Sequence, residues 1–75
     1  MEVLNLNRIP VTSSNLQSVG YDSSTQILEI EFHNGGIYQY FGVPEYEFTN
    51  LLSAPSKGTY FANNIKNRYR YSKVG

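Results

Sequence analysis

The chain has 75 residues, with six basic and six acidic side chains and no formal net charge. This length accommodates a single domain, which we place over residues 1–75. It contains no cysteine and one histidine, which excludes disulfides, thiolate zinc sites and histidine clusters, so we expect neither metal nor cofactor. No stretch approaches the roughly 20 apolar residues of a membrane span, and the start lacks a signal-peptide pattern, so a cytoplasmic protein is expected.

The first half of the chain predicts strands. Residues 1–10 form an arm that is at most an edge strand, because Pro10 cannot donate to a sheet interior. Residues 16–21 alternate apolar with small or polar side chains, which predicts a strand, and a polar turn follows at residues 22–25. Residues 27–32 give the clearest strand, with the two glutamates, Glu29 and Glu31, on the face expected to be solvated.

A hairpin follows at Asn34-Gly35, but the sequence leaves its register open. A two-residue turn pairs Ile30 with Gln39 and places Tyr38 and Tyr40 on the glutamate face. A three-residue loop with a bulge at Gly35 pairs Ile30 with Tyr38 and turns both tyrosines toward the core.

Two short helices complete the prediction. Pro44 suits the first position of a helix that ends before Pro55, and Ser56 is a good cap for a second helix over residues 57–67. The expected fold class is therefore α+β: an antiparallel three-stranded meander, with a possible extra N-terminal edge strand, followed by two helices packed on one sheet face.

Eight short segments follow one another along the chain: Ser13-Ser14-Asn15-Leu16, Val19-Gly20-Tyr21-Asp22, Leu28-Glu29-Ile30-Glu31-Phe32, Asn34-Gly35, Tyr38-Gln39-Tyr40, Val43-Pro44, Ser56-Lys57-Gly58-Thr59-Tyr60-Phe61 and Ile65-Lys66-Asn67-Arg68-Tyr69. As an ordered set, from about Val11 to Val74, they resemble the KTSC domain, which occurs at the carboxyl end of some lysyl-tRNA synthetases and as stand-alone bacterial proteins. The family has no established function, and the RNA binding suggested for it rests partly on the synthetase association.

The charges are unevenly distributed. All six acidic residues lie at or before Glu47, whereas five of the six basic residues lie from Lys57 onward, so the last nineteen residues carry five positive charges and no acid. Such a segment can bind phosphates, and the alternative is a solvated helix face that attracts the acidic sheet.

Three groups of residues are candidates for ligand binding. Tyr38 and Tyr40 lie on one strand face and would stack on unpaired bases if that face is open; the alternative is that both rings belong to the core. Ser56, Lys57 and Gly58 form an anion site at a helix N-terminus or, alternatively, an ordinary cap in which glycine allows close packing.

The third group is the basic run near the C-terminus. Its cations alternate with tyrosines, a combination that contacts phosphates and bases, although cations also favour a solvated helix end. The residues of this run are Lys66, Arg68, Arg70 and Lys73, with Tyr69 and Tyr71 between them.

No catalytic residue is expected. Glu29 and Glu31 would lie on an open sheet face without a pocket, and His33 sits beside a turn without an acid or nucleophile partner.

We therefore expect a non-enzymatic module that binds RNA, single-stranded or transfer RNA, and the alternative is a protein-interaction module. A long exposed edge strand beside Pro10 would favour that alternative. The residues expected to contact RNA are Tyr38, Tyr40, Lys57, Tyr60, Lys66, Arg68, Arg70 and Tyr71.

Overall fold

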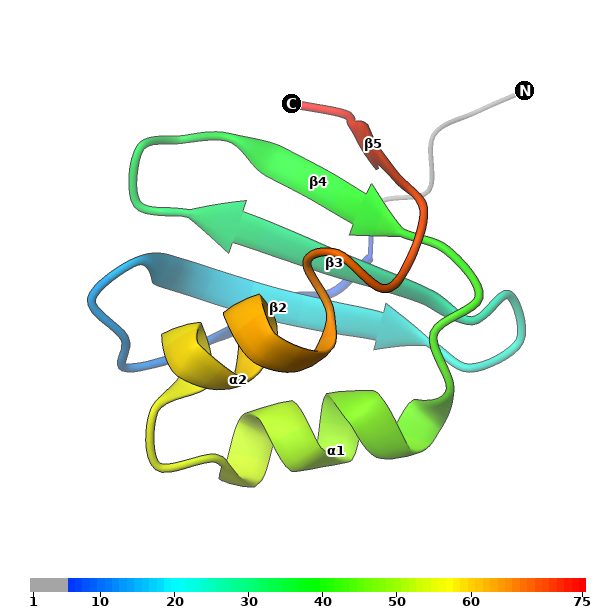
Figure 1. Ribbon diagram of the computed structural model, residues 1–75. Helices are drawn as coiled ribbons and strands as arrows, with labels where there is room; N and C mark the ends of the chain where they lie inside the picture. Colours follow the sequence, from blue (N-terminus) through cyan, green and yellow to red (C-terminus); the bar gives the residue numbers. More distant parts are fainter. Residues whose placement is uncertain (1–5) are drawn as a thin grey trace.

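The computed structural model describes residues 6–75, which form one antiparallel sheet and two helices (Figure 1). The strands are hydrogen-bonded in chain order, β1 to β5. The α+β class is confirmed, but the expected three-stranded meander is only the centre of a five-stranded sheet. The strands are β1 (Ile9–Pro10), β2 (Leu16–Asp22), β3 (Ile27–Phe32), β4 (Ile37–Tyr40) and β5 (Tyr71–Lys73).

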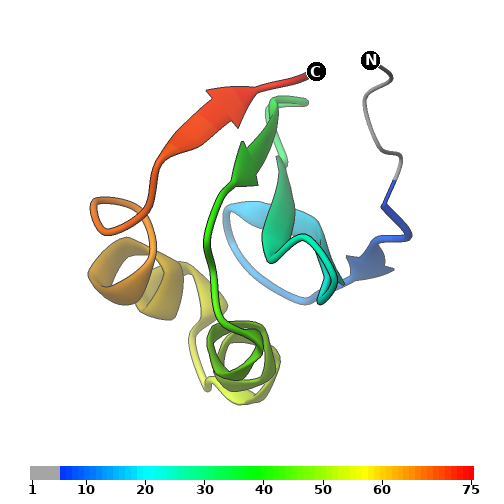
Figure 2. The same cartoon turned by 90° about the vertical axis from the view of Figure 1, so that its right-hand side faces the viewer.

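The helices α1 (Glu45–Ser53) and α2 (Lys57–Asn64) lie between β4 and β5 in the chain and on the same side of the sheet (Figure 2). Pro44 precedes α1 as its N-cap, in an extended conformation, and is not its first helical residue. The second helix ends three residues earlier than expected. Ile65 leaves the helical conformation, and the N–H groups of Ile65 and Lys66 both donate to the carbonyl of Phe61, which closes the helix.

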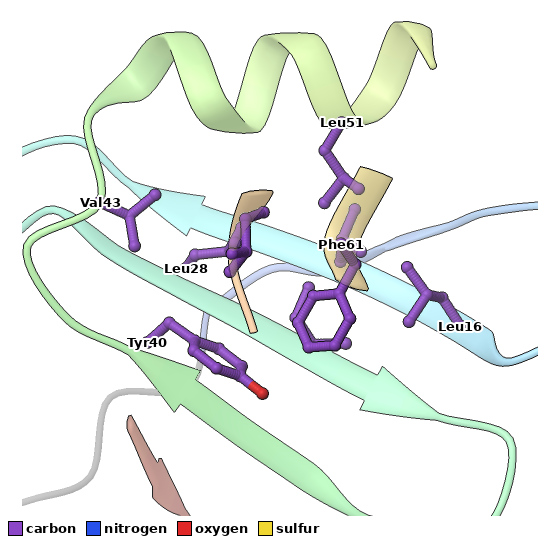
Figure 3. Close-up of a cluster of buried hydrophobic side chains, with 9 residues drawn as sticks. Leu16, Leu28, Tyr40, Val43, Leu51 and Phe61 are labelled. Atoms are coloured by element: carbon purple, nitrogen blue, oxygen red, sulfur yellow. The ribbon is translucent and has the colours of Figure 1, made fainter. Parts of the chain in front are cut away.

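The hydrophobic core lies between the helices and the sheet face that they cover (Figure 3). Leucine, isoleucine and valine side chains from β2, β3, α1 and the segments next to the helices fill it, together with Tyr40 of β4 and Phe61 of α2. Burial of such side chains supplies the main driving force for folding in a domain this small. The buried members are Leu16, Val19, Leu28, Ile30, Tyr40, Val43, Leu51, Phe61 and Ile65.

The hairpin between β3 and β4 adopts the register with a bulge. Ile30 pairs with Tyr38. Gly35 has a φ of 94°, a left-handed conformation that glycine adopts without steric cost, and its N–H donates to the carbonyl of Phe32. Both tyrosines of β4 therefore face the helices, and Tyr40 is only 4% exposed.

The opposite face of the sheet is not solvated as expected, because the described part of the N-terminal arm, residues 6–10, packs against it. Glu29 is 3% exposed and forms an ion pair with Arg8. Gln39 also donates to Glu29, at 2.8 Å, and Ser18 donates to Glu31 at the same distance. These polar contacts explain why a carboxylate is buried on a face whose alternating pattern predicts exposure.

Candidate nucleic-acid interface

An open cavity of about 390 Å³ lies between α2, the turn after it and strands β3 to β5. We call it the aromatic groove. Five of its lining side chains are aromatic, and the polar ones include one lysine and three asparagines. The lining residues are Asn15, Phe32, Asn34, Tyr38, Tyr40, Phe61, Ala62, Lys66, Asn67 and Tyr71.

The five rings contact one another in a continuous network. Phe32 meets Tyr38 and Phe61 edge to face, and Tyr40 meets Phe61 in the same way, with ring centroids 5.4–5.6 Å apart. On the strand side, Tyr71 lies 5.9 Å from Tyr38 and 5.5 Å from Tyr40. These contacts fix the orientation of the rings without any ligand.

The strand β5 supplies the outer ring of the groove. Its pairing places Tyr71 opposite Tyr40 and Lys73 opposite Tyr38, so both side chains lie on the helix-covered side of the sheet. Tyr71 remains 59% exposed even though it contacts two other rings. A ring that is fixed on one side and open on the other can stack on a planar ligand.

Tyr40 lies at the buried end of this ring network. Burial raises its pKa to about 12, and the neighbouring Tyr71 and Tyr38 add to the rise. Figure 3 shows its hydroxyl directed away from Val43. This hydroxyl makes no hydrogen bond within residues 6–75. Every fully buried side-chain nitrogen and oxygen in that range has a hydrogen-bond partner, so the Tyr40 oxygen is not fully buried. It therefore retains access to solvent through the groove that Tyr40 lines.

A second, more open hollow adjoins the aromatic groove and shares Asn34 and Tyr38 with it. It is bounded by the glycine turn Gly35-Gly36 and by Lys73, whose ammonium donates to the carbonyl of Gly75 at 2.8 Å. The two hollows together extend the open surface from α2 to the β3–β4 turn.

The cations of the C-terminal segment have no side-chain carboxylate partner among the described residues. There, Arg8 is the only basic residue in an ion pair. Four of the other five are exposed: Lys66, Arg68, Arg70 and Lys73. Cations without a carboxylate partner can neutralise phosphates without first breaking an ion pair.

Of the residues expected to contact RNA, the structure brings four together in the aromatic groove: Tyr38, Tyr40, Lys66 and Tyr71. The idea of an open platform made by both tyrosines of β4 is wrong for Tyr40, because α2 covers that face and Phe61 packs on its ring. Tyr38 is half-buried and lines both hollows.

The other four lie outside the groove. The hydroxyl of Tyr60 donates to Glu47 at 2.5 Å, so its polar end serves the contact between α1 and α2. Lys57 is half-buried and donates to the carbonyl of Ala54 at 3.3 Å. Arg68 and Arg70 are exposed on the turn that leads from α2 to β5.

The expected anion site at the start of α2 is built as a cap. Ser56 accepts the N–H of Thr59 at 3.3 Å. The carboxamide of Asn15 lies against Gly58 so closely that a Cβ at this glycine would overlap its oxygen. Gly58 therefore allows a loop before β2 to approach the helix, which matches the alternative of a glycine required for packing.

Sequence reasoning missed several residues of the groove: Asn15, Phe32, Asn34, Phe61 and Asn67. The asparagines lie in a loop and in turns, where their residue type has an ordinary structural explanation. The two phenylalanines fit a core pattern, and only the tertiary packing leaves part of them accessible.

No helix within residues 6–75 is long and apolar enough to cross a membrane.

Known proteins resemble this chain in sequence, and one of them also in structure. A KTSC domain protein from Yersinia pestis, solved as a crystal structure, is 45% identical and superposes with a TM-score of 0.91, over 95% of this chain and all of that protein. An uncharacterized protein from Stutzerimonas stutzeri is 41% identical over 70 residues, which is 92% of this chain and 99% of that protein. The lysine–tRNA ligase of Trichormus variabilis is 44% identical over 54 residues, or 72% of this chain, but the match covers only 10% of the ligase.

The sequence profile of the KTSC domain matches residues 12–69, a stretch that includes β2 to β4 and both helices. With this match and the agreement in structure, the chain belongs to the KTSC domain family.

Proposed function

We propose that this chain is a non-enzymatic module that binds single-stranded RNA through the aromatic groove. The observation that carries the proposal is an open cavity lined by the rings of Tyr38 and Tyr71 and by Lys66, with Tyr71 and Lys66 exposed. Stacking of a base on an aromatic side chain contributes about 1–3 kcal/mol and requires no particular base. The exposed cations on the turn after α2 and on β5 would contact the adjoining phosphates.

The relatives are consistent with an RNA context. Three lysine–tRNA ligases match this chain at 38–44% identity, each over about a tenth of the ligase. A domain attached to an enzyme that handles transfer RNA is well placed to contact RNA, and transfer RNA with its unpaired loops is therefore a second ligand to test.

A protein-interaction module is the alternative function. Strand addition at the edge beside Pro10 would need a long free strand, but β1 has two residues and one of them is proline. This edge therefore offers a partner strand few backbone groups to pair with, and we favour the RNA ligand.

The test is a titration with fluorescently labelled single-stranded RNA, double-stranded RNA of the same length and transfer RNA at about 50 and 200 mM salt. We expect single strands to bind better than the duplex, because only unpaired bases can enter the groove. If three phosphates are contacted, the affinity should fall about twentyfold between the two salt concentrations.

Matched variants localise the binding. Tyr71→Ala and Lys66→Ala should each weaken binding, whereas Tyr46→Ala, which removes a ring that is 61% exposed on α1 outside the groove, should leave it unchanged. The proposal is rejected if single strands do not bind at the lower salt concentration, or if Tyr71→Ala binds as well as the unaltered chain.

A further inference from the structure

Two carboxamides in the polar lining of the aromatic groove have fixed hydrogen-bond directions, and Asn34 is the first of them. Its carboxamide oxygen lies 2.9 Å from the backbone nitrogen of Gly36. Because a backbone N–H can only donate, this contact identifies the oxygen of the carboxamide and leaves the NH₂ group on the other side. No described residue accepts a hydrogen bond from that NH₂ group, and Asn34 lines the groove.

Asn15, on the helix side of the groove, is oriented in the same sense. The hydroxyl of Ser13 accepts the backbone N–H groups of Asn15 and Leu16 at 3.3 and 3.2 Å. Its own hydrogen is then directed to the carboxamide oxygen of Asn15, 3.1 Å away. The NH₂ group of Asn15 is therefore the part of this side chain that remains available to a ligand, as a donor.

The remaining polar groups add to this excess of donors. Lys66 carries an ammonium group that can only donate. The hydroxyl of Tyr40, which is 4% exposed and has no hydrogen-bond partner within residues 6–75, can donate or accept. Asn67 is the one lining carboxamide whose orientation no described contact fixes. A flat ring with a keto oxygen at the position that meets these donors matches this lining, whereas a ring with an amino group at the same position would place donor against donor.

We propose that the aromatic groove selects unpaired bases that carry a keto oxygen, such as uracil at C4, over bases that carry an exocyclic amino group at the same ring position, such as cytosine. The inference rests on the proposed function and names the class of base within it. Uracil and cytosine have the same ring size, so stacking against Tyr38 and Tyr71 discriminates little between them. The discrimination comes from the NH₂ groups of Asn15 and Asn34, which find an acceptor in the keto oxygen and none in the amino group.

The experiment compares the affinities of uridine and cytidine hexamers for the full chain under identical salt. We expect the uridine hexamer to bind about tenfold more tightly. This factor corresponds to one asparagine NH₂ group that has a hydrogen-bond acceptor in the uridine complex and none in the cytidine complex. Asn34→Asp retains the oxygen that accepts the Gly36 N–H and replaces the donor by an acceptor. It should therefore abolish or reverse the preference.

The control is Asn63→Asp, which introduces the same charge at an exposed position of α2 outside the groove. This variant should weaken both hexamers alike and leave the affinity ratio unchanged. Asn15→Asp provides a second test, because its oxygen can still accept from Ser13. It should lower the ratio as Asn34→Asp does.

The outcomes separate the two proposals. Binding of both hexamers with equal affinity overturns the selection of keto bases and leaves RNA binding in place. An unchanged preference in both Asn34→Asp and Asn15→Asp also overturns it, since the donors would then not be the selective groups. If neither hexamer binds at low salt, RNA binding itself is overturned, and the base selection falls with it.

Discussion

A single buried carboxylate connects the two helices to the segment that follows them. Glu47 lies in the first turn of α1 and is 2% exposed. The hydroxyls of Tyr60 and Tyr69 donate to its two oxygens, at 2.5 and 2.9 Å. Hydrogen bonds to a charged group are worth about 1.5–3 kcal/mol each, so this pair holds α1, α2 and the turn before β5 in one arrangement.

The contact between Tyr69 and Glu47 predicts a loss of stability at high pH. Burial, and secondly the hydrogen bond to Glu47, raise the pKa of Tyr69 from 10.0 to about 12. Between these values the unfolded chain loses a proton that the folded chain keeps, so the free energy of unfolding should fall as the pH rises through this range. Tyr69→Phe should be less stable by about 1.5–3 kcal/mol near pH 8, and its deficit should shrink toward pH 12.

Urea unfolding at a series of pH values from 8 to about 12 measures both effects. Tyr46→Phe is the matched control, because Tyr46 is 61% exposed. It should change the free energy of unfolding by less than about 0.5 kcal/mol at every pH. A constant difference between the unaltered chain and Tyr69→Phe across the pH range would contradict the assigned role of the hydroxyl.

At the scale of elements, the N-terminal arm is attached to the sheet by one glycine and one ion pair. A Cβ at Gly20 in β2 would lie 2.7 Å from the backbone oxygen of Asn7. The next residue, Arg8, donates to Ser18 at 2.9 Å and pairs with Glu29. The absence of a side chain at Gly20 therefore allows the backbone to come close enough for the arginine to reach the buried carboxylate.

Gly20→Ala should displace the arm and leave Glu29 buried without its cation, lowering the free energy of unfolding by about 3 kcal/mol or more. Arg8→Ala should have a similar effect for the same reason. Both changes break the same contact between Arg8 and Glu29. The loss in the free energy of unfolding of the double variant should therefore be smaller than the sum of the two single losses, by at least about 1 kcal/mol. Urea unfolding of the four chains measures the coupling, and strictly additive losses would show that Gly20 acts without the arm.

Strands β2 to β4 and both helices could be predicted from local patterns, because alternating and helical periodicities involve only residues that are close together in the sequence. The strand β5 could not. It has three residues, all exposed, and forms because its backbone pairs with the free edge of β4, at positions more than thirty residues away. The groove depends on this strand for Tyr71, so sequence reasoning identified several of its residues without predicting the cavity itself.

The burial of Glu29 and Glu47 could not be predicted from the sequence either. Residue type predicts exposure for both, and only partners distant in the sequence make their burial stable. The hairpin register was decided in the same way. The sequence allowed two pairings, and coverage by α2 favours the one that places Tyr40 beneath Phe61.

For the whole molecule, the zero net charge conceals an uneven distribution of charged side chains over the surface. Two carboxylates are buried, and Glu31 lies within 3.9 Å of Arg8 on the face that the arm covers. Of the described acids, this leaves Asp22 and Glu45 without such a partner, against five basic residues in the C-terminal segment. A polyanion that approaches the molecule is therefore attracted toward α2 and β5.

Together with the proposed function, this separation predicts which residues respond to RNA. In amide NMR spectra recorded during titration with a uridine hexamer, the largest shifts should occur at residues of the groove such as Asn34, Lys66 and Tyr71, because bases and phosphates would both contact that face. Gly20 and Glu29, on the arm-covered face, should shift little, since the sheet separates them from the ligand. Shifts concentrated on the arm-covered face, or spread evenly over both faces, would place the binding surface elsewhere than the aromatic groove.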